Sequence, residues 1–123
     1  MFEHFEILKK YAEELGYKVV FTDCDSWHYG TKIICNNARR KIGNRIIYLS
    51  HEIGHAYLFE CQRKDYFELF PMFLKVSKRN KIAEIEQEIL AWNEGLKIMK
   101  NFHIPVNLKN FTKIKTECLR GYL

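Results

Sequence analysis

The chain has 123 residues, of which 47% are hydrophobic and 15% aromatic, and this composition excludes an intrinsically disordered protein. No stretch approaches the roughly 18 uninterrupted apolar residues of a membrane-spanning helix, and residues 1–10 mix charged with apolar side chains, unlike a secretory signal. The 4 cysteines are scattered without a Cys-x-x-Cys pair, so we expect reduced thiols, no zinc ribbon and a cytoplasmic protein.

The formal net charge is +5, and much of it lies in two basic groups. The members of the first group are Lys97, Lys100, Lys109, Lys113, Lys115 and Arg120, and those of the second are Arg39, Arg40, Lys41 and Arg45. Basic groups of this kind can bind nucleic acid or acidic partners. The simpler interpretation is solvated helix and loop surface, and we favour it over direct nucleic-acid binding.

The first third of the chain has the pattern of a helix followed by short strands. Apolar residues recur at helical spacing over 2–15, and Gly16 provides a C-terminal stop. Residues 17–22 are rich in β-branched and aromatic side chains, which predicts a strand, and residues 27–35 predict one or two more. We expect residues 36–44 to form a polar, basic loop.

The remainder is predicted to be mainly helical, with helices over about 44–61, 82–100 and 108–119. Asn44 is a favourable N-cap residue for the first of them. Residues 62–81 contain the strongly apolar run FELFPMFLKV, which Pro71 interrupts, and this pattern fits either a short helix or a covering segment. This order of elements predicts a single α+β domain over 1–123, with the sheet of residues 17–36 packed on the 44–61 helix.

The strongest chemical signal is the run His51-Glu52-Ile53-Gly54-His55 within the 44–61 helix. Positions four apart share a helix face about 5–6 Å apart, so His51 and His55 can bind one tetrahedral zinc ion. Glu52 lies about 100° around the helix, where it is poorly placed as a ligand but can act as general base toward an attacking water. We therefore predict one Zn2+ per chain and a hydrolytic site.

The alternative to a metal site is an ordinary helix with two hydrogen-bonded histidines. Apolar neighbours on both sides of the motif place this helix in the core, where two histidines and a glutamate need a partner or a function. Gly54 costs roughly 1 kcal/mol relative to alanine in mid-helix. We expect another segment or a substrate to approach closely there, the alternative being a glycine that is merely tolerated.

A catalytic zinc ion takes a third protein ligand, and the short motif does not supply it because the residue four after His55 is Phe59. The 82–100 helix carries several glutamates around one apolar stripe, formed by Ile85, Ile89, Trp92, Leu96 and Met99. Glu88 lies closest to this stripe, about 60° from its centre on a helical wheel. We predict that Glu88 is the third ligand and that Trp92, one turn on, shields the site.

Two other residues remain candidates for the third ligand. Glu84 lies one turn before Glu88, and His103 follows the helix; Glu88 itself could instead pair with a lysine. A substrate is expected to bind beside the metal site as an added strand, along an exposed sheet edge at Thr31–Cys35.

The sequence LSHEIGH from Leu49 to His55, preceded by a predicted strand and a basic loop, resembles the metallopeptidase domain of the ImmA/IrrE type. The third ligand of that family is a glutamate in a later E-x-x-A/C-N pattern, and EILAW over 88–92 matches it with Trp in place of Asn. The resemblance covers residues 5–100, although NEGLKIMK over 93–100 departs from the family's FAAxLLMP continuation. It implies a zincin-like fold in the short, stand-alone form found in bacteriophages, and a protein substrate such as a DNA-binding regulator.

The favoured function is a zinc-dependent metallopeptidase that hydrolyses peptide bonds of a protein substrate. The alternative is a zinc-containing module that binds protein or nucleic acid without proteolytic activity. Glu52 favours hydrolysis, because a purely structural zinc site needs no general base. A nucleic-acid-associated protease of the SprT type would suit the basic charge, but the absence of a Cys-x-x-Cys ribbon argues against it.

Overall fold

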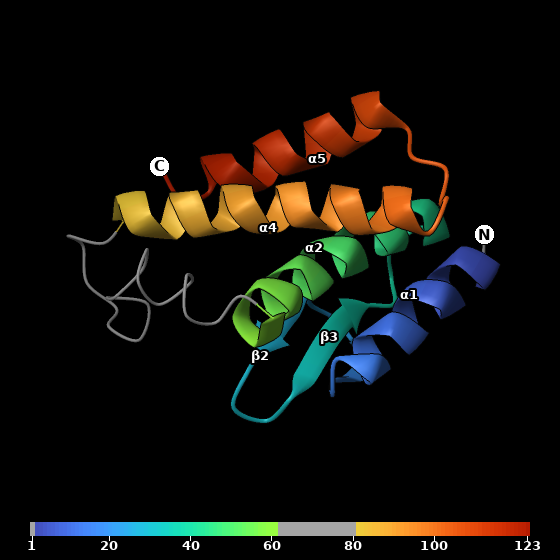
Figure 1. Ribbon diagram of the computed structural model, residues 1–123. Helices are drawn as coiled ribbons and strands as arrows, with labels where there is room; N and C mark the ends of the chain where they lie inside the picture. Colours follow the sequence, from blue (N-terminus) through green and yellow to red (C-terminus); the bar gives the residue numbers. More distant parts are fainter. Residues whose placement is uncertain (1, 62–80) are drawn as a thin grey trace.

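The computed structural model describes residues 2–61 and 81–123, and this part of the chain forms helices around a three-stranded sheet (Figure 1). The elements in chain order are α1 (Phe2–Glu14), β1 (Lys18–Thr22), β2 (Ser26–His28), β3 (Ile33–Asn37), α2 (Ile42–Cys61), α4 (Lys81–Asn101) and α5 (Leu108–Arg120). The predicted α+β class is confirmed. The prediction for residues 62–81 lies outside the described residues, except that Lys81 begins α4.

The sheet has the strand order β1-β3-β2, so β3 is the central strand. β3 pairs in parallel with β1 over its whole length and antiparallel with β2, in the register Ser26↔Cys35 to His28↔Ile33. The prediction that Thr31–Cys35 is an exposed edge is therefore wrong, because Ile33–Cys35 are paired on both sides. The strands at the two edges are β1 and β2.

The predicted loop over 36–44 is shorter in the structure because Asn36 and Asn37 belong to β3 and α2 already begins at Ile42. The predicted N-cap at Asn44 is therefore wrong, since Asn44 lies inside the helix. Asn36 is fully buried, and its amide exchanges hydrogen bonds with Arg45: Nδ2 donates to the backbone oxygen at 3.2 Å and Oδ1 accepts from Nε at 3.0 Å. Asp25 accepts from the backbone N–H of Asn37 at 2.9 Å and forms an ion pair with Arg40. Two members of the second basic group are thus used to hold the start of α2 to the sheet.

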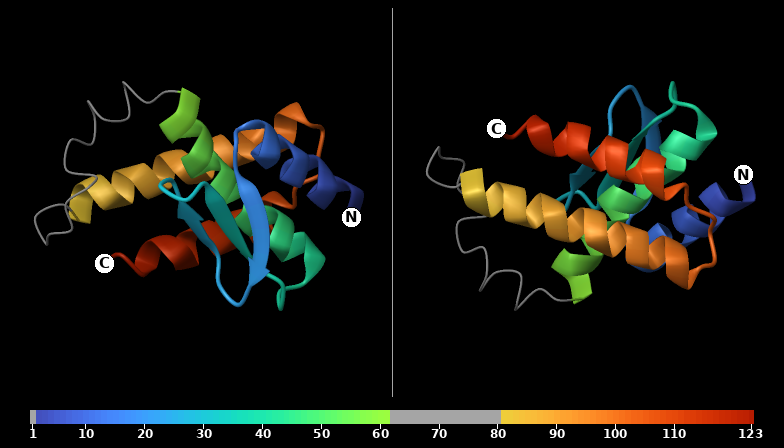
Figure 2. Two further views of the ribbon diagram at one scale, coloured as in Figure 1. Left: turned by 90° about the horizontal axis from the view of Figure 1, so that it is seen from below. Right: turned by 90° about the horizontal axis from the view of Figure 1, so that it is seen from above.

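α2 and α4 form the centre of the molecule. The sheet and α1 pack on α2, while α5 runs antiparallel beside α4 (Figures 1 and 2). The two central helices approach closely because each presents a glycine to the backbone of the other. A Cβ on Gly54 would overlap the carbonyl oxygen of Ala91, and a Cβ on Gly95 would lie 2.6 Å from the carbonyl oxygen of Ser50. The close approach expected at Gly54 is confirmed, and α4 is the segment that makes it.

The buried face of α4 differs from the predicted apolar stripe. Its buried residues are Gln87, Ala91, Trp92, Gly95, Ile98 and Met99, whereas Ile85, Ile89 and Leu96 are only half-buried. The helix is rotated toward its small residues because Ala91 and Gly95 allow the close contact with α2. This rotation brings Glu88 nearer to the centre of the buried face than the hydrophobic pattern indicated.

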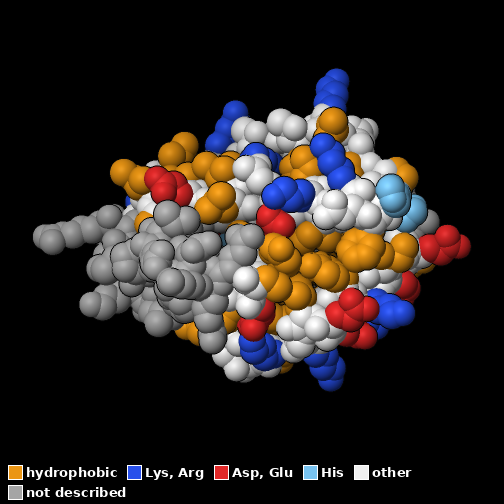
Figure 3. All heavy atoms as spheres, in the orientation of Figure 1, with side chains coloured by type: hydrophobic (Ala, Val, Ile, Leu, Met, Phe, Trp, Pro, Cys, Tyr) orange, Lys and Arg blue, Asp and Glu red, His pale blue; other side chains and the backbone are white. Residues whose placement is uncertain are grey.

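Three further features concern the thiols, the basic side chains and the lengths of the helices. The four cysteines, Cys24, Cys35, Cys61 and Cys118, are free thiols. On the face shown in Figure 3, lysine and arginine side chains are spread among apolar and acidic ones and do not form one continuous patch. None of the helices in residues 2–61 and 81–123 has the length and apolar character needed to cross a membrane.

Substitution of Gly54 by alanine is expected to destabilise the protein by about 1–3 kcal/mol, the typical cost of overpacking. The added methyl group would meet backbone atoms of α4 that cannot move independently, and this cost exceeds the roughly 1 kcal/mol gained in helix propensity. Urea-induced unfolding measures the change. Gly30→Ala is the matched control, because no atom lies within 4 Å of the added Cβ. Equal stabilities for Gly54→Ala and the parent would contradict the close contact.

Candidate metal centre

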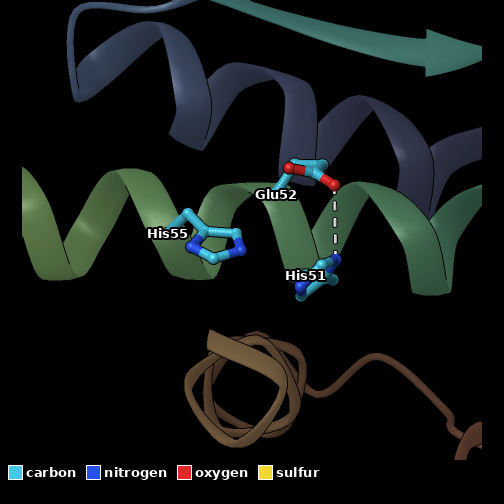
Figure 4. Close-up of side chains that lie close together, drawn as sticks. All are labelled: His51, Glu52 and His55. Atoms are coloured by element: carbon cyan, nitrogen blue, oxygen red, sulfur yellow. Dashed lines mark ion pairs between the residues drawn. The ribbon is translucent and has the colours of Figure 1, made fainter. Parts of the chain in front are cut away.

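Three side chains of the motif gather on α2. His51, Glu52 and His55 are all buried, and one potential ligand atom from each lies within 4.8 Å of the others. The imidazole centroids are 4.8 Å apart, as expected for residues one helical turn apart. Figure 4 shows Glu52 turned back toward His51, with Oε1 3.3 Å from Nδ1. The expectation that Glu52 is poorly placed as a ligand is therefore too strict, because side-chain flexibility offsets its position on the helix.

Glu88 enters the same site from α4. Its Oε2 lies 2.7 Å from His51 Nε2, and its Oε1 lies 3.1 Å from His55 Nε2. One carboxylate thus spans the two imidazoles of the motif. The other candidates lie elsewhere: His103 is exposed beyond the end of α4, and Glu52 and Glu88 are the only glutamates among the described residues that line the cleft.

Both imidazole rings are held by tryptophan rings. Trp92 stacks on His51 with the ring planes 7° apart and the centroids 4.0 Å apart, and Trp27 stacks on His55 at 6° and 5.3 Å. The Trp27 ring is itself held by a hydrogen bond, because its Nε1 donates to Tyr17 Oη at 3.1 Å. The predicted shielding by Trp92 is seen as direct stacking on His51. The corresponding role of Trp27 was missed, because nothing in its sequence position links it to the motif.

The charges in the site are strongly coupled. Burial by itself would lower the pKa of His51, but the carboxylates of Glu52 and Glu88 outweigh burial and raise this pKa to about 9. Burial would likewise raise the pKa of Glu88, whereas hydrogen bonds and charges from His51 and His55 hold it well below its usual range. Without a metal ion, His51 therefore keeps its proton at neutral pH. Because a histidine binds a metal ion in its neutral form, metal binding at His51 would release this proton.

The site opens into a cleft of about 650 Å3. Its walls come from the β1–β2 connection, β2, α2, α4 and the segment at the end of α5, and they include Asp25, Trp27, Arg40, Tyr48, Cys118 and Tyr122. Burial, the charge of Glu88 and a hydrogen bond to that carboxylate raise the pKa of Tyr122, so its hydroxyl stays protonated. Tyr122 was not predicted as a site residue, because it lies 34 positions from the glutamate that it contacts.

Comparisons with protein-family models, with curated proteins and with solved structures found no match to this chain.

For the metal-free protein, we expect the His51 imidazole to titrate with a pKa of about 9 and this pKa to fall in the Glu88→Gln variant. Since the pKa is above the ordinary value of about 6.5, the proton stabilises the fold fully below that pH, and its contribution is lost as the pH rises through about 9. NMR titration of the ring protons measures the pKa. Glu86→Gln, an exposed change on the same helix, should leave it unchanged. An unshifted His51 in Glu88→Gln would show that the pair is not formed in solution.

Proposed function

We propose that this protein is a zinc-dependent metallopeptidase with a zincin-like site, in which His51, His55 and Glu88 bind one zinc ion and Glu52 is the general base. The observation that carries the proposal is the position of Glu88, whose carboxylate contacts both Nε2 atoms of the motif. Two imidazole nitrogens and one carboxylate oxygen are a ligand set of hydrolytic zinc enzymes. The donor chemistry of the site therefore fits the ion.

The two carboxylates have different surroundings, which supports different roles. Glu88 comes from a second helix and faces both Nε2 atoms, so it can bind an ion held between the imidazoles. Glu52 lies on the Nδ1 side of His51 and also lines the cleft, where it can take a proton from a water molecule. When bound, zinc supplies Lewis-acid chemistry by lowering the pKa of water and polarising the scissile carbonyl.

An extended peptide is the substrate form that we propose for the cleft. β2 is an edge strand, and two of its residues, Ser26 and Trp27, line the cleft beside His55. A peptide that paired with β2 as an added strand would pass directly over the motif. This replaces the predicted docking edge at Thr31–Cys35. The resemblance to ImmA/IrrE-type domains of bacteriophages supports a protein substrate and suggests a DNA-binding regulator as its class.

Zinc binding distinguishes the proposed ligand set from the alternatives. Loss of a residue that only hydrogen-bonds to a metal ligand typically weakens metal binding by roughly 10- to 100-fold. We expect Glu88→Ala to weaken zinc binding by more than this, because it removes a ligand. Glu84→Ala and His103→Ala should bind zinc like the parent, because neither residue lines the described part of the cleft. Competition with a chromophoric chelator, on protein made without a histidine tag, gives the affinities. Tight binding by Glu88→Ala together with a loss in either control would reassign the third ligand.

Glu52→Gln separates catalysis from metal binding. The amide keeps the size of the side chain but cannot accept a proton, so we expect retained zinc and a loss of cleavage of 100-fold or more, about the size of general-base effects. Cleavage is followed by mass spectrometry on a peptide library that the parent digests. If the variant cleaves as fast as the parent, Glu52 is not the base. If the parent binds zinc but digests no protein or peptide, the non-proteolytic zinc-binding module is favoured.

A further inference from the structure

Tyr122 joins the segment that follows α5 to the candidate metal centre. α5 returns antiparallel along α4, so its C-terminal end lies near the first half of α4, where Glu88 is located (Figures 1 and 2). The backbone of the segment is held by helical-turn hydrogen bonds, with the N–H of Gly121 donating to Cys118 O at 3.2 Å and that of Tyr122 donating to Leu119 O at 3.1 Å. The tyrosine is therefore presented from an ordered turn.

The hydroxyl of Tyr122 donates a hydrogen bond to Glu88 Oε1 at 2.9 Å. The same oxygen lies 3.1 Å from His55 Nε2, while Oε2 faces His51. Among the described residues, the carboxylate is thus held by two imidazoles from α2 and one phenol from the C-terminal segment. These partners are not equivalent, because the imidazole nitrogens are themselves proposed ligands.

A metal ion bound by the Nε2 atoms of His51 and His55 would replace the hydrogen bonds that these atoms otherwise make to Glu88. Of the three groups that contact Glu88, the Tyr122 phenol would then keep its hydrogen bond to the carboxylate. A glutamate has three rotatable side-chain bonds. A glutamate that no hydrogen bond holds in place therefore loses conformational entropy when it becomes a metal ligand. Outer hydrogen bonds that orient metal ligands lower this cost.

We propose that Tyr122 is a positioning residue of the metal centre, which holds the Glu88 carboxylate in its ligand orientation through one hydrogen bond. The inference rests on the proposed function and deepens it, since it makes the segment after α5 a functional part of a site built mainly on α2 and α4. Tyr122 acts through Glu88 and does not itself bind the metal.

The test is the zinc affinity of Tyr122→Phe, which keeps the ring and removes the hydroxyl. We expect binding about 10- to 100-fold weaker than in the parent. Tyr48→Phe is the matched control, because Tyr48 also lines the cleft but its hydroxyl accepts from Cys118 Sγ at 3.8 Å. Its zinc affinity should equal that of the parent. The visible spectrum of bound Co2+, which reports ligand number and geometry, should change in Tyr122→Phe and not in Tyr48→Phe.

A double-mutant cycle shows whether Tyr122 acts through Glu88. In the Glu88→Ala background, Tyr122→Phe should cause no further loss of affinity, whereas an equal loss in both backgrounds would mean a general effect on the fold and overturn the inference. Parent-like affinity of Tyr122→Phe would also overturn it while leaving the zinc site intact. If the parent binds zinc no better than a His51→Ala, His55→Ala double variant, the proposed function fails instead.

Discussion

The backbone contact between α2 and α4 is the constraint on which the rest of the structure depends. Gly54 and Gly95 each lie against the backbone of the opposite helix, and neither position has room for a Cβ atom. The contact fixes both the separation and the rotation of the helices, and bulkier residues would move the two faces apart. Glu88 and Trp92 lie on the α4 face next to this contact, so the same packing that removes space at the glycines brings them against the two histidines.

Buried ionisable groups are costly unless they have partners, and the site supplies several of them. Glu88 contacts the Nε2 atoms of both imidazoles, a tryptophan ring stacks on each imidazole, and Tyr17 accepts a hydrogen bond from Trp27, whereas His55 Nδ1 is buried without a hydrogen-bond partner among the described residues. The Tyr17 hydroxyl donates to Glu60, which in turn pairs with Lys32. Contacts thus run from Lys32 through Glu60, Tyr17 and Trp27 to a ring stack on His55, and Glu88 continues them to α4.

The sequence by itself determined the elements and the chemistry of the motif. Helical periodicity and the β-branched run predicted the helices and strands to within a few residues, because both signals are local. The spacing of His51 and His55 placed two imidazoles on one helix face, since that distance is fixed by the helix itself. Glu88 was likewise predicted from a local pattern, because its place beside an apolar stripe indicated that it faces inward.

Only the tertiary structure decided how these elements combine. β3 pairs on both sides and leaves β2 at the edge, because strand order depends on contacts between segments and not on the character of any one strand. α4 turns toward Gly95 and not toward its most apolar stripe, because backbone approach at the glycines outweighs the burial of Ile85 and Ile89. Trp27 and Tyr122 join the site from distant parts of the chain, and no spacing in the sequence records a contact that arises from the packing of whole helices and strands.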